Sequence, residues 1–326
     1  MKYVKDILSN TFTTLPIISG RINMTLVDDI LKLKREKKAV ILAHNYQRPE
    51  IQDIADYVGD SIELSRRAKE EKDAKIIVFA AVNFMAESAA ILNPEKKVLL
   101  PCMGSRCSMV QMLPAEQLKI WKQRYPNTPV VLYVNTLAEA KAECDVCCTS
   151  ANAIKIVETL DGETILFGPD RNLAEYVQEK TGKKVIPIPP QGFCPTHILF
   201  MKEDIMAQRQ AHPDAVVAVH PECSKEVREI ADFIGSTSQI CRYSNILSVK
   251  KFIIGTEVGI LHKLRKENPD KQFLPAYGGA TCNAMKLTTL ERLYHSLKEE
   301  QNPVSVPKSI AKKAKKALNK MFALTE

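Results

Sequence analysis

No stretch of this sequence approaches the roughly 20 apolar residues that a membrane-spanning helix requires. The first residues do not resemble a secretory signal peptide, because Lys5 and Asp6 interrupt any apolar core and no small-residue cleavage site follows. The sequence also lacks basic residues interleaved with aromatic ones, and it has no nucleic-acid-binding motif. We therefore expect a cytoplasmic protein that crosses no membrane and binds no nucleic acid.

Charge and cysteine content further narrow the expected class of protein and its compartment. The 326 residues are 45% hydrophobic and 26% charged, as in ordinary globular proteins, and carry a formal net charge of +8. Much of the excess lies in lysines between residues 308 and 320, which form a solvated helix face or help to attract anionic metabolites. Nine cysteines without a secretory signal favour a reducing compartment, where thiols more often bind metals or react than form disulfides.

Three of the cysteines stand at nearly even intervals along the chain. Cys107, Cys194 and Cys282 are separated by 87 and 88 residues. Each follows an apolar run that meets a proline and then a glycine, and each precedes a helix-like stretch. One thiol at the same place in three repeated units is what a pseudo-threefold protein needs to gather three ligands on its axis.

Strand-like runs repeat with the same period. First strands are expected at 39–46, 129–135 and 215–222, second strands at 76–80, 164–168 and 251–255, and a third strand leads into each cysteine. Short apolar runs with helices between them are typical of parallel sheets buried on both faces. We predict an α/β protein with units at 22–110 (preceded by the segment 1–21), 111–197 and 198–285, followed by a C-terminal helical segment at 286–326.

A hydroxyl residue opens a helix between the first and second strands of each unit. Ser61, Ser150 and Thr237 precede their cysteines by 46, 44 and 45 residues. A helix N-terminus binds carboxylate or phosphate through its free backbone N–H groups, and a hydroxyl adds a further donor. The alternative is that each hydroxyl only caps its helix. Three such turns aimed at one axis favour a small polyanionic substrate held largely by neutral donors.

Polar residues close the first strands, where parallel sheets bind their ligands. They are His44 and Tyr46 in the first unit, Tyr133 and Asn135 in the second, and His220 and Glu222 in the third. Alternate residues of a strand share a face, so we expect each histidine to pair with its neighbour as a proton-transfer group. Tyr133 and Asn135 are better suited to hydrogen-bond the substrate. Packing of the units around one axis would bring all of these groups to one cavity.

The three repeated cysteines predict a metal centre with an open position. Zinc takes four ligands in structural sites, whereas three thiolates on a four-iron cluster would leave one iron free as a Lewis acid. Buried, unreactive thiols are the alternative for any single cysteine. Cys144, Cys147 and Cys148 resemble half of a metal knuckle, but no second pair follows at a suitable spacing. We expect these cysteines to pack or to line the approach to Ser150.

The chain closely resembles the quinolinate synthase (NadA-type) family over residues 40–290. The motifs that carry the resemblance are AHNYQ at 43–47, GDS at 59–61, VNFMAE at 82–87, YVNT at 133–136, CTSAN at 148–152, GPDRN at 168–172, GFCPTH at 192–197, HPEC at 220–223, GST at 235–237 and GGATC at 278–282. The resemblance implies three similar three-layer α/β/α domains with parallel sheets around a pseudo-threefold axis, in agreement with the repeat.

The resemblance also implies a reaction and a cofactor. Iminoaspartate condenses with dihydroxyacetone phosphate, phosphate and two waters leave, and quinolinate forms for de novo NAD synthesis. A [4Fe–4S] cluster is held by the matches to Cys107, Cys194 and Cys282. An enzyme that oxidises aspartate is the expected source of iminoaspartate. The implied substrate-binding residues are His44, Ser61, Tyr133, Val134, Asn135, Ser150, His220, Pro221, Glu222, Ser236 and Thr237, and His44, Tyr46, His220 and Glu222 are the implied catalytic residues.

The sequence departs from part of the family at the third cysteine. Some members carry a CxxCxxC motif there with a proposed redox role, but Cys282 has no neighbouring cysteine, so we expect that switch to be absent. Two other functions compatible with the residues are a non-catalytic iron–sulfur sensor or electron carrier, and an iron–sulfur hydro-lyase acting on another small polycarboxylate. The ring of His, Tyr, Glu and hydroxyl groups around an incomplete ligand set favours an enzyme.

Overall fold

The computed structural model of the chain describes residues 17–325, so most of the predicted segment 1–21 lies outside the described residues. The first unit runs through α1 (Ile17–Glu36), β1 (Ala39–His44), α2 (Pro49–Ile54), β2 (Tyr57–Gly59), α3 (Ser61–Glu70), β3 (Ile76–Ala80), α4 (Asn83–Leu92), β4 (Lys97–Leu99) and η1 (Ser108–Gln111). The second comprises α5 (Ala115–Arg124), β5 (Val130–Tyr133), α6 (Ala138–Lys141), β6 (Val146–Cys148), α7 (Ala153–Thr159), β7 (Thr164–Gly168), α8 (Arg171–Thr181), β8 (Lys184–Pro187) and η2 (His197–Leu199).

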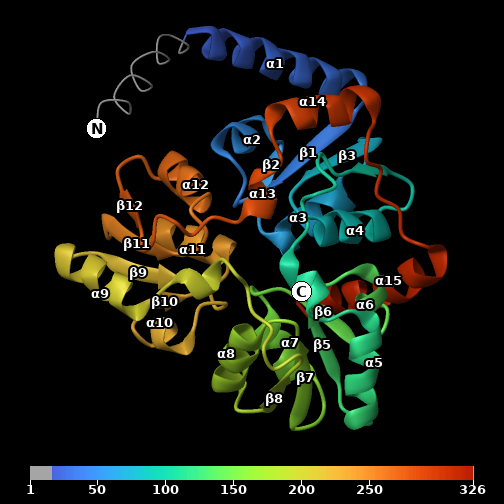
Figure 1. Ribbon diagram of the computed structural model, residues 1–326, viewed down its shortest axis with the longest axis vertical. Helices are drawn as coiled ribbons and strands as arrows, with labels where there is room; N and C mark the ends of the chain where they lie inside the picture. Colours follow the sequence, from blue (N-terminus) through green and yellow to red (C-terminus); the bar gives the residue numbers. More distant parts are fainter. Residues whose placement is uncertain (1–16, 326) are drawn as a thin grey trace, which may run out of the picture.

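The third unit repeats this order, and two helices follow it. Its elements are α9 (Lys202–Ala211), β9 (Val216–Val219), α10 (Lys225–Glu229), β10 (Phe233–Ile234), α11 (Thr237–Ile246), β11 (Lys251–Gly255), α12 (Ile260–Glu267), β12 (Gln272–Pro275) and α13 (Asn283–Lys286). The chain continues with α14 (Leu290–Glu299) and α15 (Lys308–Ala323). Figure 1 shows the three units as three lobes around a common centre.

Each unit contains one parallel sheet, and the three sheets share one topology. Their strand orders are β2-β1-β3-β4, β6-β5-β7-β8 and β10-β9-β11-β12. This confirms the predicted α/β class and the threefold repeat. It corrects the number of strands, because each sheet has four strands where the sequence indicated three. The missed strands β2, β6 and β10 are only two or three residues long, too short to form a distinct apolar run.

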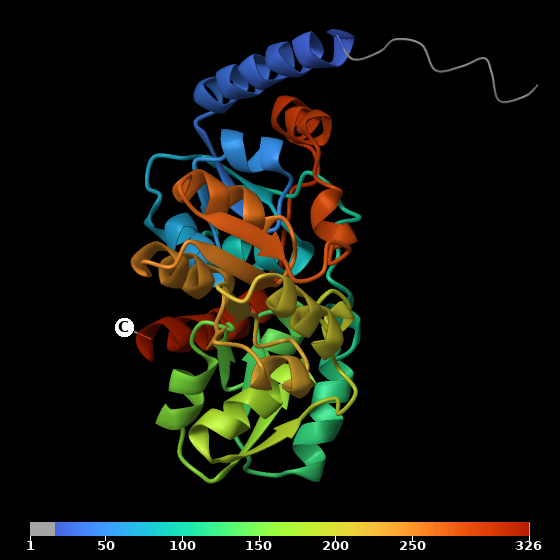
Figure 2. The same cartoon turned by 90° about the vertical axis from the view of Figure 1, so that its left-hand side faces the viewer.

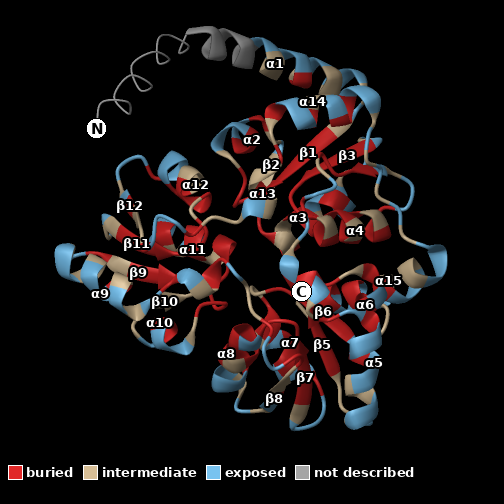
Figure 3. Cartoon of the chain, viewed as in Figure 1, coloured by how far each residue is buried: buried red, intermediate tan, exposed pale blue. Residues whose placement is uncertain are grey.

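Both faces of each sheet are buried, which explains the continuous apolar strands. In β1, Val40 and Leu42 face one core while Ile41 and Ala43 face another. In β9 and β11 of the third unit, alternate residues divide in the same way between two cores. Burial is concentrated in the strands at the centre of each lobe, and the outer helix faces are exposed (Figure 3). The strands are therefore held rigidly, and their ends point toward the middle of the molecule.

The last two helices return to the earlier units. Helix α14 packs beside α1 over the first unit, where Leu293 and Leu297 join the core that contains Ile30 (Figure 2). Helix α15 packs on β6, α6 and α4, so it covers the boundary between the first and second units. Its buried face includes Leu318 and Phe322, while most of its lysines are exposed, as expected for a solvated helix face. No helix among the described residues is long and apolar enough to cross a membrane.

Candidate active site

A cavity lies where the three units meet. Its volume is about 70 Å³, several times the roughly 10–15 Å³ that one water molecule needs. Residues from all three units line it, and they include each of the three repeated cysteines. The predicted residues that line it are His44, Tyr46, Ser61, Tyr133, Asn135, Ser150, His220, Glu222 and Thr237. Apolar side chains, among them Val82, Phe84 and Met285, complete the wall.

The three cysteines follow their strands on short loops, at or just before a helical turn. Cys107 precedes η1, Cys282 precedes α13, and Cys194 lies three residues before η2. All nine cysteines of the chain are free. The repeat therefore places one free thiol from each unit at the same cavity, although each lies on a loop beyond its strand rather than at the strand end itself.

The chemistry of the three thiols suits binding to a metal cluster. Burial, with a contribution from the nearby Cys282, raises the pKa of Cys107 to about 12, although the backbone N–H of Met109 acts in the opposite direction. Burial also raises the pKa of Cys194, and Glu222 and Cys107 add to that rise. Buried thiols that oppose one another's ionisation lose their protons when a metal supplies the compensating positive charge. The residues present therefore fit a cluster with three cysteine ligands.

Two histidines on first-strand ends are oriented in the same way. The backbone N–H of Tyr46 donates to His44 Nδ1 and that of Glu222 donates to His220 Nδ1, both at 3.2 Å. Because Nδ1 accepts in both rings, the neutral form carries its proton on Nε2. Burial lowers the pKa of each histidine to about 3. Both rings are thus neutral N–H donors at physiological pH, and His220 Nε2 lies 3.2 Å from Ser150 Oγ.

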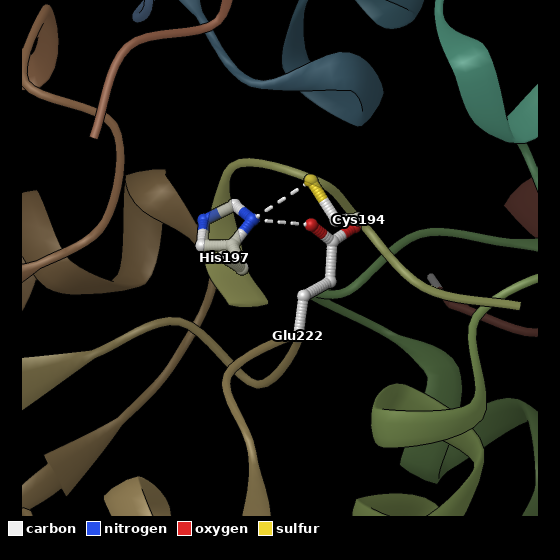
Figure 4. Close-up of side chains that lie close together, drawn as sticks. All are labelled: Cys194, His197 and Glu222. Atoms are coloured by element: carbon white, nitrogen blue, oxygen red, sulfur yellow. Dashed lines mark hydrogen bonds and ion pairs between the residues drawn. The ribbon is translucent and has the colours of Figure 1, made fainter. Parts of the chain in front are cut away.

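A chain of buried side chains joins Tyr46 to Glu222 through residues that the sequence analysis did not assign to the site. The Tyr46 hydroxyl is 2.6 Å from Thr256 Oγ1, and Thr256 Oγ1 is 2.8 Å from His197 Nε2. His197 Nδ1 is 2.6 Å from Glu222 Oε2 and 3.2 Å from Cys194 Sγ (Figure 4). Tyr46 and Glu222 therefore make their shortest side-chain contacts with Thr256 and His197, not with His44 and His220.

The direction of the hydrogen bonds between Tyr46 and Glu222 follows from the charge of the Glu222 carboxylate. Burial alone would raise the pKa of Glu222, but His197, His220 and Tyr133 outweigh it and lower the pKa to about 2. The ionised carboxylate can only accept, so His197 Nδ1–H donates to it and Nε2 is left to accept from Thr256. Thr256 in turn accepts from the Tyr46 hydroxyl, whose pKa burial raises. The arrangement matches a hydroxyl–histidine–carboxylate triad extended by a phenol.

Cys194, His197 and Glu222 also form the kind of group that holds a single metal ion. Their ligand atoms all lie within 4.8 Å of one another. Nitrogen and oxygen ligands on one zinc ion, each at about 2.0–2.2 Å from it in tetrahedral geometry, would be more than about 3 Å apart. The 2.6 Å between His197 and Glu222 is shorter than that and fits a charge-assisted hydrogen bond. We therefore assign the pair to hydrogen bonding and Cys194 to the set of three cysteines.

The hydroxyl turns are not simple caps. Asp60 and Ser236 cap α3 and α11 by accepting backbone N–H groups. Ser61 and Thr237 are the next residues along, and they line the cavity together with Ser150. Asn45 Nδ2 donates to Thr237 Oγ1 at 2.8 Å and so orients that hydroxyl across two units. Because the caps already occupy backbone donors of α3 and α11, binding of an anion there would depend mainly on the side-chain hydroxyls.

Other predicted residues differ in how directly they face the cavity. Asn135 Oδ1 is buried in the cavity wall without a hydrogen-bond partner among the described residues, as expected of a group that binds a ligand. Val134, Pro221 and Ser236 are not among the lining residues. They remain predicted substrate-binding residues that adjoin lining residues in the chain.

The remaining cysteine group does not reach the cavity. Cys144 Sγ and Cys147 Sγ are 3.9 Å apart, beside the fully buried Lys141, and no disulfide joins them. Cys147 and Cys148 belong to β6 and to the core on one face of the second sheet. Packing, one of the two roles expected for these cysteines, accounts for what the structure shows of them.

Comparisons with known proteins agree with this site. Residues 28–323 match the family described as Quinolinate synthetase A protein. The curated quinolinate synthase of Thermodesulfovibrio yellowstonii is 52% identical over 298 residues, which cover 91% of this chain and 98% of the relative. Those of Thermotoga maritima and Methanothermobacter thermautotrophicus are each 51% identical, over 92% and 91% of this chain and 99% and 98% of theirs. The chain belongs to the quinolinate synthase family.

Proposed function

We propose that the chain condenses iminoaspartate with dihydroxyacetone phosphate to give quinolinate, phosphate and two waters, as a step of de novo NAD synthesis. The observation that carries this proposal is the shared cavity. Three cysteines, one from each unit, line the same cavity as the predicted histidines, hydroxyls and Glu222. Family membership over nearly the whole chain supports the same activity.

Cys107, Cys194 and Cys282 would hold a [4Fe–4S] cluster in this cavity. When bound, the cluster would supply one iron without a protein ligand, a Lewis acid for an oxygen atom of the substrate. The protein would supply binding, orientation and proton transfer. Nine free cysteines suit the reducing cytoplasm in which we expect the enzyme to act.

Neutral donors would bind the carboxylate and phosphate groups of the substrates. The hydroxyls of Ser61, Ser150 and Thr237 face the cavity, and the Nε2–H groups of His44 and His220 point away from their backbone contacts. Preorganised donors in a dry cavity stabilise developing negative charge without reorganising.

Proton transfer would use the chain from Tyr46 to Glu222. A proton that leaves the Tyr46 hydroxyl passes to Thr256 Oγ1, while the Thr256 proton passes to His197 Nε2. His197 then carries a positive charge next to Glu222, which stays ionised because its pKa is about 2. The reverse movement returns the proton to Tyr46, so the chain can serve the enolisation and dehydration steps in turn.

The apolar part of the cavity wall would also protect the imine. Iminoaspartate hydrolyses in water, and apolar side chains such as Phe84 and Met285 exclude water from the wall. An enzyme that oxidises aspartate would provide this unstable substrate. The ligands come from three units, whose borders we place near residues 110, 197 and 285, so small movements between units would let substrates enter.

Cluster binding is tested by replacing each ligand with alanine in protein prepared without oxygen. Cys107→Ala, Cys194→Ala and Cys282→Ala should each lose iron, sulfide and quinolinate formation. Cys102→Ala is a matched control, because that half-buried cysteine lies on the same loop as Cys107 but does not line the cavity. A ligand variant that keeps a full and active cluster would refute the assignment.

Product analysis tests the reaction itself. Purified protein is incubated anaerobically with dihydroxyacetone phosphate and with aspartate plus an aspartate oxidase, and quinolinate is measured by mass spectrometry. A protein that binds a full cluster but forms no quinolinate, and whose cluster spectrum does not respond to substrate, would be a sensor or carrier instead. Dehydration of another polycarboxylate by the same protein would favour a hydro-lyase.

A further inference from the structure

A buried carboxylate outside the proposed reaction lies directly behind the third cysteine. Glu257 follows β11, is fully buried and does not line the cavity. Its Oε1 accepts the backbone N–H of Cys282 at 3.0 Å, and its Oε2 accepts that of Gly259 at 2.7 Å. Lys286 Nζ lies 2.9 Å from Oε1 and 3.2 Å from Oε2. A buried carboxylate with this many bonds fixes the segments that supply them.

Lys286 links this carboxylate to the first unit. It is the last residue of α13, and its ammonium also donates to the backbone carbonyl of Tyr46. The neighbouring Arg48 Nε donates to the carbonyl of Lys286 at 2.8 Å, and Gln47 Nε2 lies 3.6 Å from Met285 Sδ. The loop that carries Tyr46 and the turn that follows Cys282 are therefore joined at several points.

Gly259 shows how closely these groups approach one another. A Cβ atom at this position would lie 2.7 Å from Lys286 Nζ, 2.8 Å from Glu257 Oε2 and 2.8 Å from the Tyr46 carbonyl carbon. The backbone at Gly259 has φ −60° and ψ −27°, which any residue can adopt. The lack of space beside the Glu257–Lys286 pair, and not the backbone conformation, therefore requires glycine here.

A contact of the same kind is present in the first unit, which supports a role at the cysteines. In the first unit, Asn83 Oδ1 accepts the backbone N–H of Cys107 at 3.3 Å. In the second, Asp170 stands at the equivalent place, where its Oδ1 accepts the backbone N–H of Leu173 at 2.8 Å and its Oδ2 is buried without a hydrogen-bond partner among the described residues. Each of these side chains stands two or three residues after the second long strand of its unit. A polar side chain therefore stands at this place in each unit, and in the first and third units it accepts the backbone N–H of the cysteine.

We propose that Glu257 and Lys286 are a positioning pair that fixes the third cysteine relative to Tyr46, so that a cluster ligand and a proton-transfer group keep one alignment. This inference rests on the proposed cluster and goes beyond it. Neither side chain touches the reacting groups; they act through the backbone of Cys282 and the carbonyl of Tyr46. Partners that orient metal ligands in this way commonly change metal affinity or activity by about 10–100-fold when they are removed.

The test compares Lys286→Met, Glu257→Gln and Lys286→Arg with the parent protein after anaerobic reconstitution. We expect Lys286→Met and Glu257→Gln to lose iron to a chelator at least about tenfold faster and to show a kcat at least about tenfold lower, with a smaller change in KM. Lys286→Arg, which keeps the positive charge, should show an iron-loss rate and a kcat close to those of the parent. Lys266→Met is the control, because Lys266 is an exposed lysine of α12 that pairs with Asp53. Iron-loss rates and kcat within about twofold of the parent in both variants would overturn the proposal.

A second measurement does not depend on the cluster. In metal-free protein, amide hydrogen exchange at Cys282 and Gly259 should be faster in Lys286→Met, while strands of the second unit keep their protection. Gly259→Ala, which on backbone grounds should stabilise the chain, should instead speed exchange at Cys282. Unchanged protection of the Cys282 amide in both variants would also overturn the proposal. A parent protein that assembles no cluster would refute the proposed function, and the exchange data would still decide on the pair.

Discussion

Replacement of Thr256 by valine is the sharpest test of the proton-transfer chain. Valine has nearly the same shape as threonine but has no hydroxyl, and Thr256 is 1% exposed between Tyr46 at 2.6 Å and His197 at 2.8 Å. The substitution removes the partner of two buried polar groups, and each group left unpaired costs about 1–3 kcal/mol. Tyr46 Oη and His197 Nε2 are 3.4 Å apart, too far for their contact to replace the two lost hydrogen bonds fully.

The expected kinetic effect is larger than the effect on folding. Loss of a positioned proton-transfer group lowers a rate by about 10²–10⁴-fold, so kcat for quinolinate should fall by at least about 10²-fold. Iron and sulfide contents should stay at the parent values, because Thr256 touches no cysteine of the cluster set. Thr256→Ser keeps a hydroxyl and should retain most of the activity. A Thr256→Val enzyme with an intact cluster and the parent kcat would refute the chain as a path for protons.

Two further predictions concern stability. His44 and His220 have folded-state pKa values of about 3, so between that pH and 6.5 the unfolded chain binds more protons and the metal-free protein loses stability as the pH falls. The slope of the unfolding free energy against pH should be about 1.4 kcal/mol per pH unit for each histidine. His44→Gln should lower that slope, measured by urea unfolding, by the same amount. An unchanged slope would contradict the assignment. Arg228→Met should lower the unfolding free energy by about 1–3 kcal/mol, because it removes the donor to the buried carbonyls of Asn172 and Cys223, while the pairs with the half-exposed Glu175 and Glu179 add little. A change below about 1 kcal/mol would show that these hydrogen bonds contribute little.

The repeat could be predicted because it is written within each unit. Tyr133 has the same strand position as His44 and His220, and the hydroxyl turns and cysteines keep the same spacing from it. Local apolar runs and turn residues determine these elements, so the sequence alone predicted the three cysteines and nine of the other residues that line the cavity. The three short edge strands escaped prediction because two or three residues carry no recognisable pattern.

The residues that were not predicted act between units. His197 was visible as one of six histidines, three residues after Cys194, and Thr256 directly follows the second strand of the third unit. Their role depends on Tyr46 from the first unit lying within 2.6 Å of Thr256, a contact that no spacing along the chain expresses. The signal that was available for Thr256 was its position, because parallel sheets bind ligands where their strands end.

The even spacing of the cysteines has a mechanical consequence. Binding of one cluster to residues 107, 194 and 282 would close two chain loops of 87 and 88 residues, as a pair of disulfides would. In the loop-entropy model for cross-links, closure of a loop of this length removes about 4–5 kcal/mol of unfolded-state entropy at 25 °C. The cofactor would then cross-link the whole chain as well as take part in the reaction, and its loss would destabilise all three lobes together.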